Sequence, residues 1–320
     1  MQKPVSIILP VYNSELFLKD CIKSILDQTF KKFELIIVLD KSKDNSEKII
    51  KSFKDKRIRL IKKKNKTNLA DALNLGIKYS KGSLIARADS DDVYKKNRIQ
   101  EQYYFLKKNN EIDIVGSSVK IISKKKSNYI YFPEKNLTIK WAMFFSCPLA
   151  HPTIMFRKKS LKKIKFYNSK ALFEDYDLYS RGFNELKFYN IQKVLATLRD
   201  RDESLYKKNF KFSSLELNMY KKFIYMHYNI KASNEDLRAI VYKKISKKSK
   251  KFEMIIKNIL EKINQPDIEI KNLTIYLLSS ILIKNRRYFL FLKNLNYFFS
   301  LNKFFFTMLI IMLFKRNFKI

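Results

Sequence analysis

Glycine is scarce in this chain of 320 residues, which contains four glycines, at positions 76, 82, 116 and 182. No two of them have the spacing of a dinucleotide-binding fingerprint, and no Gly-Lys-Ser or Gly-Lys-Thr sequence closes a phosphate-binding loop. The sequence therefore excludes the two commonest glycine-rich ways of holding a nucleotide. If the chain binds a nucleotide, it must use other residues.

Cysteine and histidine are also few, with two of each: Cys21, Cys147, His151 and His227. They do not follow the paired spacing of a four-ligand zinc site, and two cysteines cannot build a disulfide framework. The amino terminus enters an apolar stretch directly, without the charged and hydrophobic regions of a signal peptide. We therefore expect a cytoplasmic protein with reduced cysteines.

Positive charge, in contrast, is abundant: the formal net charge is +37, and 46% of the residues are hydrophobic. The hydrophobic content argues for a folded core. The lysines are spread along the chain, and no RNA-recognition, helix-turn-helix or zinc-finger pattern accompanies them. A chain-wide compositional bias explains this better than nucleic-acid binding, although both explanations stay open. In either case a basic surface would attract anionic membranes and nucleotide-linked substrates.

The first part of the chain alternates between apolar strands and amphipathic helices. Apolar runs at residues 5–11 and 33–39 predict buried strands, residues 57–61 predict a third, and a fourth should end at Ala88. Helices are predicted after Ser14, which would be an N-cap, and over residues 68–79. This alternation predicts an α/β fold with a mostly parallel sheet, in which ligands bind beyond the carboxyl ends of the strands.

Three aspartates follow the fourth predicted strand: Asp89, Asp91 and Asp92. Like charges at this spacing repel one another unless a cation neutralises them. If the alternation of the strand continues, Asp89 and Asp91 point to the same side and could share one Mg²⁺ or Mn²⁺ ion. The alternative is a solvated acidic turn, because aspartate is common at turns and helix N-caps.

Two further polar groups occur in the middle of the chain. His151 precedes Pro152 in an expected loop, before a strand predicted over residues 153–156. Taken alone, it reads as a loop histidine. Glu174 and Asp175 open an amphipathic helix, where their plainest role is to complement the helix dipole.

Several segments follow one another in a characteristic order: Pro10-Val11-Tyr12-Asn13, Asp40 with Ser42 and Asp44, residues 69–77, residues 86–92, His151-Pro152-Thr153, and residues 174–178. In this order and spacing they resemble the family 2 glycosyltransferases of the bacterial surface-polysaccharide type. The resemblance covers roughly residues 3–200. It implies a GT-A nucleotide-sugar-binding fold, with a Rossmann-like sheet flanked by helices, and an inverting transfer.

The resemblance also implies roles for individual residues. It assigns the nucleotide-sugar donor to Pro10, Tyr12, Asn13, Asp40, Asn68, Asn74, Arg87 and Asp89. It makes Asp89 and Asp91 the ligands of Mn²⁺ or Mg²⁺, and Asp175 the general base that takes a proton from the acceptor hydroxyl. His151 and Glu174 would contact the acceptor or the diphosphate.

Three positions depart from the family pattern. Leu39 and Lys41 replace an aspartate and a glycine around Asp40, and Asn68 replaces a glycine, with asparagine tolerating the left-handed conformation that glycine would supply. A UDP-sugar is the default donor. The Gln-x-x-Arg-Trp sequence of processive synthases does not occur, which predicts single additions to a glycan or lipid-linked acceptor in surface polysaccharide, capsule or lipooligosaccharide synthesis. A catalytically silent nucleotide-sugar-binding homologue is the alternative.

We expect a catalytic domain over residues 1–200, with a donor half to about residue 110 and an acceptor half from about residue 111. Residues 201–320 should form a helical, basic and aromatic region. Its apolar runs, at residues 276–292 and 304–314, are too interrupted or too short to span a bilayer, which takes about 20 apolar residues. They would lie peripherally on the inner face of the cell membrane or pack against the catalytic domain, and both alternatives stay open.

Overall fold

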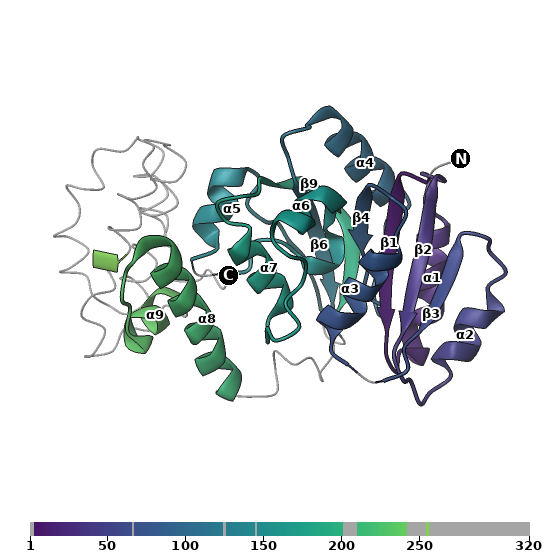
Figure 1. Ribbon diagram of the computed structural model, residues 1–320, viewed down its shortest axis with the longest axis horizontal. Coiled ribbons are helices and arrows are strands. Elements are labelled where there is room, and N and C mark those ends of the chain that lie inside the picture. Colours follow the sequence, from purple (N-terminus) through teal and green to yellow (C-terminus); the bar gives the residue numbers. More distant parts are fainter. Residues whose placement is uncertain are drawn as a thin grey trace. The chain divides into compact units, whose positions relative to one another are not determined.

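The computed structural model describes residues 3–65, 67–123, 126–144, 146–200, 210–241 and 254–255 (Figure 1). The chain divides into two compact units. The first comprises Met1–Met143 with Cys147–Lys208, and the second comprises Phe144–Ser146 with Asn209–Ile320. Every strand among the described residues belongs to the first unit, whereas the second contains the helices α8 (Phe210–Tyr228) and α9 (Asn234–Val241).

The described part of the first unit is built on one nine-stranded sheet. Its order is β3-β2-β1-β4-β8-β6-β9-β5, and β7 pairs with β6 outside this path. Parallel pairing, as predicted, joins the first four strands: β1 (Val5–Val11), β2 (Phe33–Leu39), β3 (Ile58–Lys62) and β4 (Leu84–Arg87). The remaining strands form a mixed part: β5 (Val93–Tyr94), β6 (Ile114–Ile122), β7 (Ser127–Ile130), β8 (Met155–Arg157) and β9 (Phe188–Arg199).

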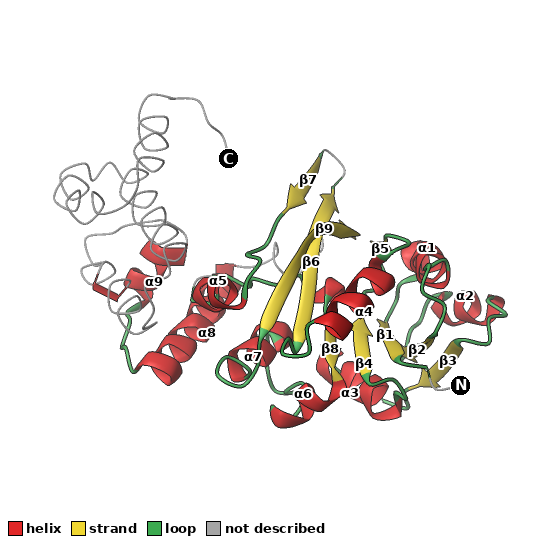
Figure 2. Cartoon of the chain, turned by 90° about the horizontal axis from the view of Figure 1, so that it is seen from above, coloured by secondary structure: helices red, strands yellow, loops and turns green. Residues whose placement is uncertain are grey.

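Strands β1 and β2 are buried along their whole length because helices cover both faces of this part of the sheet. Helices α1 (Glu15–Leu26) and α2 (Ser46–Ser52) lie on one face, and α3 (Leu69–Tyr79) lies on the other (Figures 1 and 2). One core cluster joins the odd-numbered positions of β1 to the buried side chains of α1, namely Leu18, Cys21, Ile22 and Ile25. Each such aliphatic side chain contributes about 1.5–3 kcal/mol when fully buried.

The second half of the first unit contains the other helices: α4 (Arg98–Lys108), α5 (Asn136–Ala142), the 3₁₀ helix η1 (His151–Thr153), α6 (Lys158–Lys163) and α7 (Glu174–Arg181). The strand predicted over residues 153–156 is wrong at its start, because β8 begins at Met155. Thr153 instead closes η1: its backbone N–H and its hydroxyl both donate to the carbonyl of Ala150, each at 2.8 Å. The helix predicted to open with Glu174 and Asp175 is confirmed.

Ser14 precedes α1 as expected, but its side chain does not cap the helix. Its hydroxyl is occupied elsewhere, because it lies 2.6 Å from the hydroxyl of Ser90 and donates to the carbonyl of Tyr12 at 3.1 Å. Asp44 takes over the capping role from the neighbouring loop: its Oδ2 accepts a hydrogen bond from the backbone N–H of Glu15 at 2.8 Å. The start of α1 is therefore fixed by the loop that follows β2.

Among the helices that the structure describes, none is both long enough and apolar enough to cross a bilayer. The apolar runs at residues 276–292 and 304–314, which we expect to meet a membrane or the core, lie outside the described residues. Their environment therefore stays a prediction.

Candidate active site

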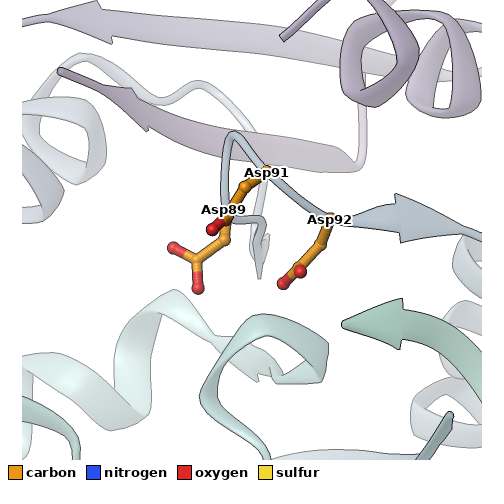
Figure 3. Close-up of side chains that lie close together, drawn as sticks. All are labelled: Asp89, Asp91 and Asp92. Atoms are coloured by element: carbon orange, nitrogen blue, oxygen red, sulfur yellow. The ribbon is translucent and has the colours of Figure 1, made fainter. Parts of the chain in front are cut away.

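The acidic loop, which we define as residues 88–92, follows β4 and carries Asp89, Asp91 and Asp92. Carboxylate oxygens of these residues all lie within 4.8 Å of one another, and the side chains extend to the same side of the loop (Figure 3). The expected reason for this grouping is wrong. Strand β4 ends at Arg87 instead of Ala88, so the course of the loop, not strand alternation, brings the carboxylates together. Asp92, which was not predicted as a ligand, belongs to the group as fully as the other two.

Hydrogen bonds from β5 and α1 fix the backbone of the acidic loop. The backbone N–H of Asp89 donates to the hydroxyl of Tyr94 at 2.7 Å, and the thiol of Cys21 donates to the carbonyl of Asp89 at 3.0 Å. The hydroxyl of Ser90 lies 2.6 Å from that of Ser14. The loop and the start of α1 are therefore held together directly.

Arg199, at the end of β9, holds the other side of the acidic loop and was not predicted from the sequence. Its backbone N–H donates to Asp92 Oδ1 at 3.1 Å, and its guanidinium donates to the carbonyl of Asp91 at 3.0 Å and to Asp20 Oδ2 at 3.2 Å. The guanidinium also lies over the ring of Phe17, 4.5 Å from its centroid. No local pattern distinguishes this residue among the 67 lysines and arginines, because its contact depends on β9 pairing with β5.

The electrostatics of the acidic loop suit a divalent cation. Burial, together with the charges of Asp89 and Asp91, raises the pKa of Asp92 to about 8. Asp89 is paired with the buried Arg87, whose Nη1 lies 2.5 Å from Asp89 Oδ2. Three carboxylates this close, one of which retains its proton, are a donor set that a hard cation would neutralise. The residues therefore fit Mg²⁺ or Mn²⁺.

A hollow of about 260 Å³ lies beside the acidic loop at the carboxyl ends of β1 and β2. Its lining consists of Pro10, Val11, Tyr12, Asp40, Thr67, Asn68, Leu69, Ala72, Asp89 and Ser90. Five of the residues assigned to the donor by resemblance therefore meet here: Pro10, Tyr12, Asp40, Asn68 and Asp89. A larger hollow, of about 460 Å³, lies between α4 and β9 but contains none of the predicted site residues.

The other three donor-side residues, Asn13, Asn74 and Arg87, are not part of this lining. Asn13 has a φ of 45°, and its Oδ1 accepts a hydrogen bond from the backbone N–H of Lys43 at 2.9 Å. Asn74, on α3, makes two hydrogen bonds to the backbone of Tyr167: its Nδ2 donates to the carbonyl at 2.9 Å, and its Oδ1 accepts from the N–H at 3.1 Å. Asn74 therefore holds the segment that carries Tyr167.

Asp40 is 7% exposed and joins the loops on two sides of the hollow. Its carboxylate accepts hydrogen bonds from the backbone N–H groups of Lys41 at 2.9 Å and Thr67 at 3.2 Å, and it lies 3.4 Å from Lys63 Nζ. Any residue other than proline at position 41 would supply that N–H, so the departure from glycine leaves this contact unchanged. Asn68 has a φ of −91°, so it does not use the left-handed conformation that glycine would supply; its side chain caps α3.

His151 is buried between a tyrosine and a glutamate. Its Nε2 lies 2.9 Å from the hydroxyl of Tyr167, and its Nδ1 lies 3.5 Å from Glu174 Oε1. Burial by itself raises the pKa of Glu174, but the hydrogen bond and charge of His151 outweigh burial and lower the pKa to about 2. Glu174 is therefore ionised at neutral pH and is a weak base.

Asp175 is half-buried at the start of α7, beside Cys147. The thiol of Cys147 donates to Asp175 Oδ2 at 3.6 Å, and Asp175 Oδ1 accepts from the backbone N–H of Tyr176 at 2.7 Å. Burial, followed by the charge of Asp175, raises the pKa of the Cys147 thiol, which therefore keeps its proton at neutral pH. Each carboxylate oxygen retains a further lone pair, so Asp175 can accept a proton from a hydroxyl group.

Hydrogen bonds link the start of α7 to α3 through Tyr167. The hydroxyl of Tyr167 lies 2.9 Å from His151 Nε2, and His151 Nδ1 lies 3.5 Å from Glu174 Oε1. The backbone of Tyr167 is held by Asn74 of α3, the helix whose first turn lines the hollow. The hollow and the start of α7 are therefore connected through one helix.

Comparison with known proteins identifies the family. The model described as glycosyl transferase family 2 matches residues 6–165. The chain belongs to glycosyltransferase family 2. An uncharacterized glycosyltransferase of Methanocaldococcus jannaschii is 33% identical to it over 72% of this chain and 80% of that protein. The O-antigen biosynthesis glycosyltransferase WbnJ of Escherichia coli is 32% identical over 63% of this chain and 82% of its own length. The expected membership of glycosyltransferase family 2 is confirmed.

Solved structures confirm the GT-A fold of this family 2 glycosyltransferase. TarS of S. aureus, in complex with UDP-GlcNAc, has a TM-score of 0.57 at 17% identity and covers 86% of each chain. The mannosyltransferase PcManGT of Pyrobaculum calidifontis, in complex with GDP-Man and Mn²⁺, has a TM-score of 0.54 at 11% identity over 96% of this chain and 83% of that one. At these identities the likeness concerns the fold alone.

Proposed function

We propose that this glycosyltransferase moves one sugar from a UDP-sugar to a glycan or lipid-linked acceptor in surface polysaccharide, capsule or lipooligosaccharide synthesis, with inversion at the anomeric carbon. The observation that carries the proposal is the hollow beside the acidic loop, which is lined by five of the residues that the resemblance assigns to the donor. Glu174 and Asp175, at the start of α7, are the candidate acceptor-side carboxylates that a single displacement requires. The likeness to folds solved with UDP-GlcNAc and GDP-Man supports a nucleotide-sugar donor.

We assign the metal to Asp89, Asp91 and Asp92. The Mn²⁺ in PcManGT and the close grouping of these carboxylates support the assignment. A bound Mn²⁺ or Mg²⁺ would stabilise the charge of the departing nucleoside diphosphate. Arg199 keeps the carbonyl of Asp91 in place. Asp92, whose pKa is raised to about 8, would have to release its proton to solvent in order to serve as a ligand.

The acceptor side of the reaction needs a base, and Asp175 is our candidate. The low pKa of Glu174, about 2, makes Glu174 too weak to remove a hydroxyl proton efficiently. Its fixed negative charge and its contact with His151 suit a group that orients an acceptor. In a single displacement, Asp175 takes the proton while the acceptor oxygen attacks, and an α-linked nucleotide sugar gives a β-glycoside.

We place the catalytic domain within residues 1–200 and give residues 201–320 an accessory role at the membrane. The net charge of +37 supports work at the cytoplasmic face of the cell membrane, where anionic lipids attract basic proteins. A lipid-linked acceptor would be available at that face.

The test is turnover by the full chain on a panel of UDP- and GDP-sugars, with Mn²⁺, Mg²⁺ or a chelator. We expect one UDP-sugar to release UDP slowly without acceptor, and only when metal is present. Transfer to an acceptor should give the inverted anomer by nuclear magnetic resonance. Chelator-resistant turnover would contradict the metal assignment. Thermal stabilisation by nucleotide sugars without any turnover would identify a silent binder instead.

A further inference from the structure

Strands β6 and β7 form a hairpin whose outer side is unusually apolar for an exposed surface. Strand β7 is exposed along its whole length, and Figure 2 shows it with the end of β6 projecting from the sheet. Large exposed hydrophobic side chains gather here within a short stretch: Ile122 (41% exposed), Tyr129 (58%), Ile130 (36%) and Tyr131 (63%). Single exposed hydrophobic residues are ordinary, but a group of this size marks a contact surface.

The pairing register places two members of this group on one face. Lys120 pairs with Tyr129, and Ile122 pairs with Ser127. Because side chains alternate along a strand, Lys120, Ile122 and Tyr129 point to the same side. The position of Lys120 Nζ, 5.7 Å from the centroid of the Tyr129 ring, agrees with this. Ile121 points the other way and packs against the core. Tyr131 lies one residue beyond the end of β7 and is the most exposed of the group.

The same hairpin is basic. Lys126 is exposed and lies at the turn, where its carbonyl accepts from the backbone N–H of Ser123 at 2.9 Å. The sequence contains no aspartate or glutamate between residues 114 and 133. Aromatic side chains with polar tips beside lysines are the combination that settles at the headgroup level of a bilayer.

We propose that the hairpin patch, which consists of Lys120, Ile122, Tyr129 and Tyr131 with Lys126 at the adjoining turn, binds the surface of an anionic lipid bilayer. The tyrosine rings would enter the interface, and the lysines would meet the lipid phosphates. Charge also argues against a second copy of this chain as the occupant, because two molecules that each carry a formal charge of +37 repel one another.

The hairpin is connected directly to the acidic loop. Ile122, at the end of β6, pairs with Arg199 of β9, and Arg199 donates to the carbonyl of Asp91. A bilayer bound at the patch would therefore lie near the acidic loop, which suits an acceptor with a lipid anchor. This last step depends on the proposed function, whereas the binding of lipid does not.

The first test is sedimentation of the full chain with vesicles of phosphatidylcholine, with and without phosphatidylglycerol. We expect binding only to the anionic vesicles, and about tenfold weaker binding for the Tyr129→Ser/Tyr131→Ser variant. Tyr104→Ser is the matched control, because Tyr104 is 60% exposed on α4, outside the patch. Release of UDP from a soluble UDP-sugar should be equal in all three proteins. This assay tests the proposed function without lipid, so its failure can be distinguished from a failure of lipid binding.

The second test places a fluorescent reporter in the patch. When anionic vesicles are added, the tryptophan emission of the Tyr131→Trp variant should shift to shorter wavelengths and should be quenched by brominated lipids. The emission of Tyr104→Trp should show neither change. The native Trp141 is buried and gives a constant background. Equal quenching at both positions would overturn the proposal. Normal vesicle binding by the double serine variant, or no binding by the wild type, would also overturn the proposal. If the serine substitutions dissociate an oligomer, the patch is a subunit interface and the proposal is overturned.

Discussion

The guanidinium of Arg199 donates a hydrogen bond to the backbone carbonyl of Asp91 at 3.0 Å. The backbone N–H of Arg199 also binds the carboxylate of Asp92, at 3.1 Å. One residue at the end of β9 therefore controls both the path of the acidic loop and the orientation of one of its carboxylates. Groups that orient metal ligands in this way commonly change metal affinity by 10- to 100-fold when they are removed.

Arg199→Ala should weaken the metal site without destroying it. The variant loses the side-chain bonds to Asp91 and Asp20 but keeps the backbone bond to Asp92. We expect the Mn²⁺ concentration for half-maximal UDP release to rise about tenfold. Turnover at saturating Mn²⁺ should change little. Arg59→Ala is the control, because Arg59 bonds the carbonyl of Tyr79 outside the acidic loop. An unchanged metal titration would show that Arg199 has no positioning role.

Asp91→Asn should abolish metal-dependent turnover and leave the fold intact. The substitution keeps the shape of the side chain but removes one of the three charges. Because the charge of Asp91 raises the pKa of Asp92, the pKa of Asp92 should fall in the variant. Calorimetric titration with Mn²⁺ measures the affinity for the metal, and thermal melting checks that the fold is intact. Wild-type affinity for Mn²⁺ would remove Asp91 from the ligand set.

Asp175→Asn should preserve donor binding and stop transfer. Asparagine cannot accept the proton, and loss of a general base reduces the rate by about 10²- to 10⁴-fold, roughly 3 to 5 kcal/mol of barrier. Asp177→Asn is the matched control, because it removes a charge from the same first turn and breaks only the pair with Arg181. Transfer at saturating donor and UDP affinity should be measured for both. Near-normal transfer by the Asp175 variant would assign the base elsewhere.

The stability of the protein should depend on Glu174 in one pH window. The folded-state pKa of Glu174 is lowered to about 2, below the value of about 4.3 for an unfolded chain. A lowered pKa means that the ionised form stabilises the fold above pH 4.3, and that this contribution is lost as the pH falls toward 2. The difference in melting temperature between the wild type and Glu174→Gln should therefore shrink over that range. A melting-temperature difference that stays constant over this pH range would indicate that the charge of Glu174 does not contribute to stability.

Gly76→Ala should destabilise the donor half although alanine favours helices. The added β-carbon would lie 2.4 Å from Ile8 Cγ2 and 3.3 Å from Val38 Cγ2. Overpacking of this kind costs about 1–3 kcal/mol, against a helix-propensity gain of about 1 kcal/mol. Denaturant unfolding measures the loss. Ile8→Ala is itself destabilising because Ile8 is buried, but the double variant should lose less stability than the sum of the two single variants. Strictly additive losses would show that the two residues do not compete for space.

The parts of the fold that the sequence predicted are those that short-range patterns determine. Strands β1 and β2 are continuous apolar runs, and a strand buried on both faces needs no other signal. The three aspartates were identified as a group for the same reason, because they are neighbours in the chain. The end of β4 was not predicted correctly. A strand ends where its partner strand and the following turn allow, and these lie in other segments of the chain.

The residues that complete the site depend on contacts between distant segments. Cys147 lies beside Asp175 only because the loop before η1 returns to the start of α7. Tyr167 is fixed by Asn74, a residue 93 positions earlier in the chain. Neither residue carries a local pattern, and the family resemblance did not include Cys147 or Tyr167. Such residues become visible only when the packing of the sheet and its helices is known.

Helix α3 connects the hollow to the segment that carries Tyr167. Its N-cap Asn68 and its first turn, with Leu69 and Ala72, line the hollow, while Asn74 further along the same helix holds the backbone of Tyr167. A nucleotide sugar in the hollow would therefore press on the helix that positions the partner of His151. If the proposed function is correct, we expect an ordered addition in which the donor binds before the acceptor, so that UDP inhibits in competition with the donor alone.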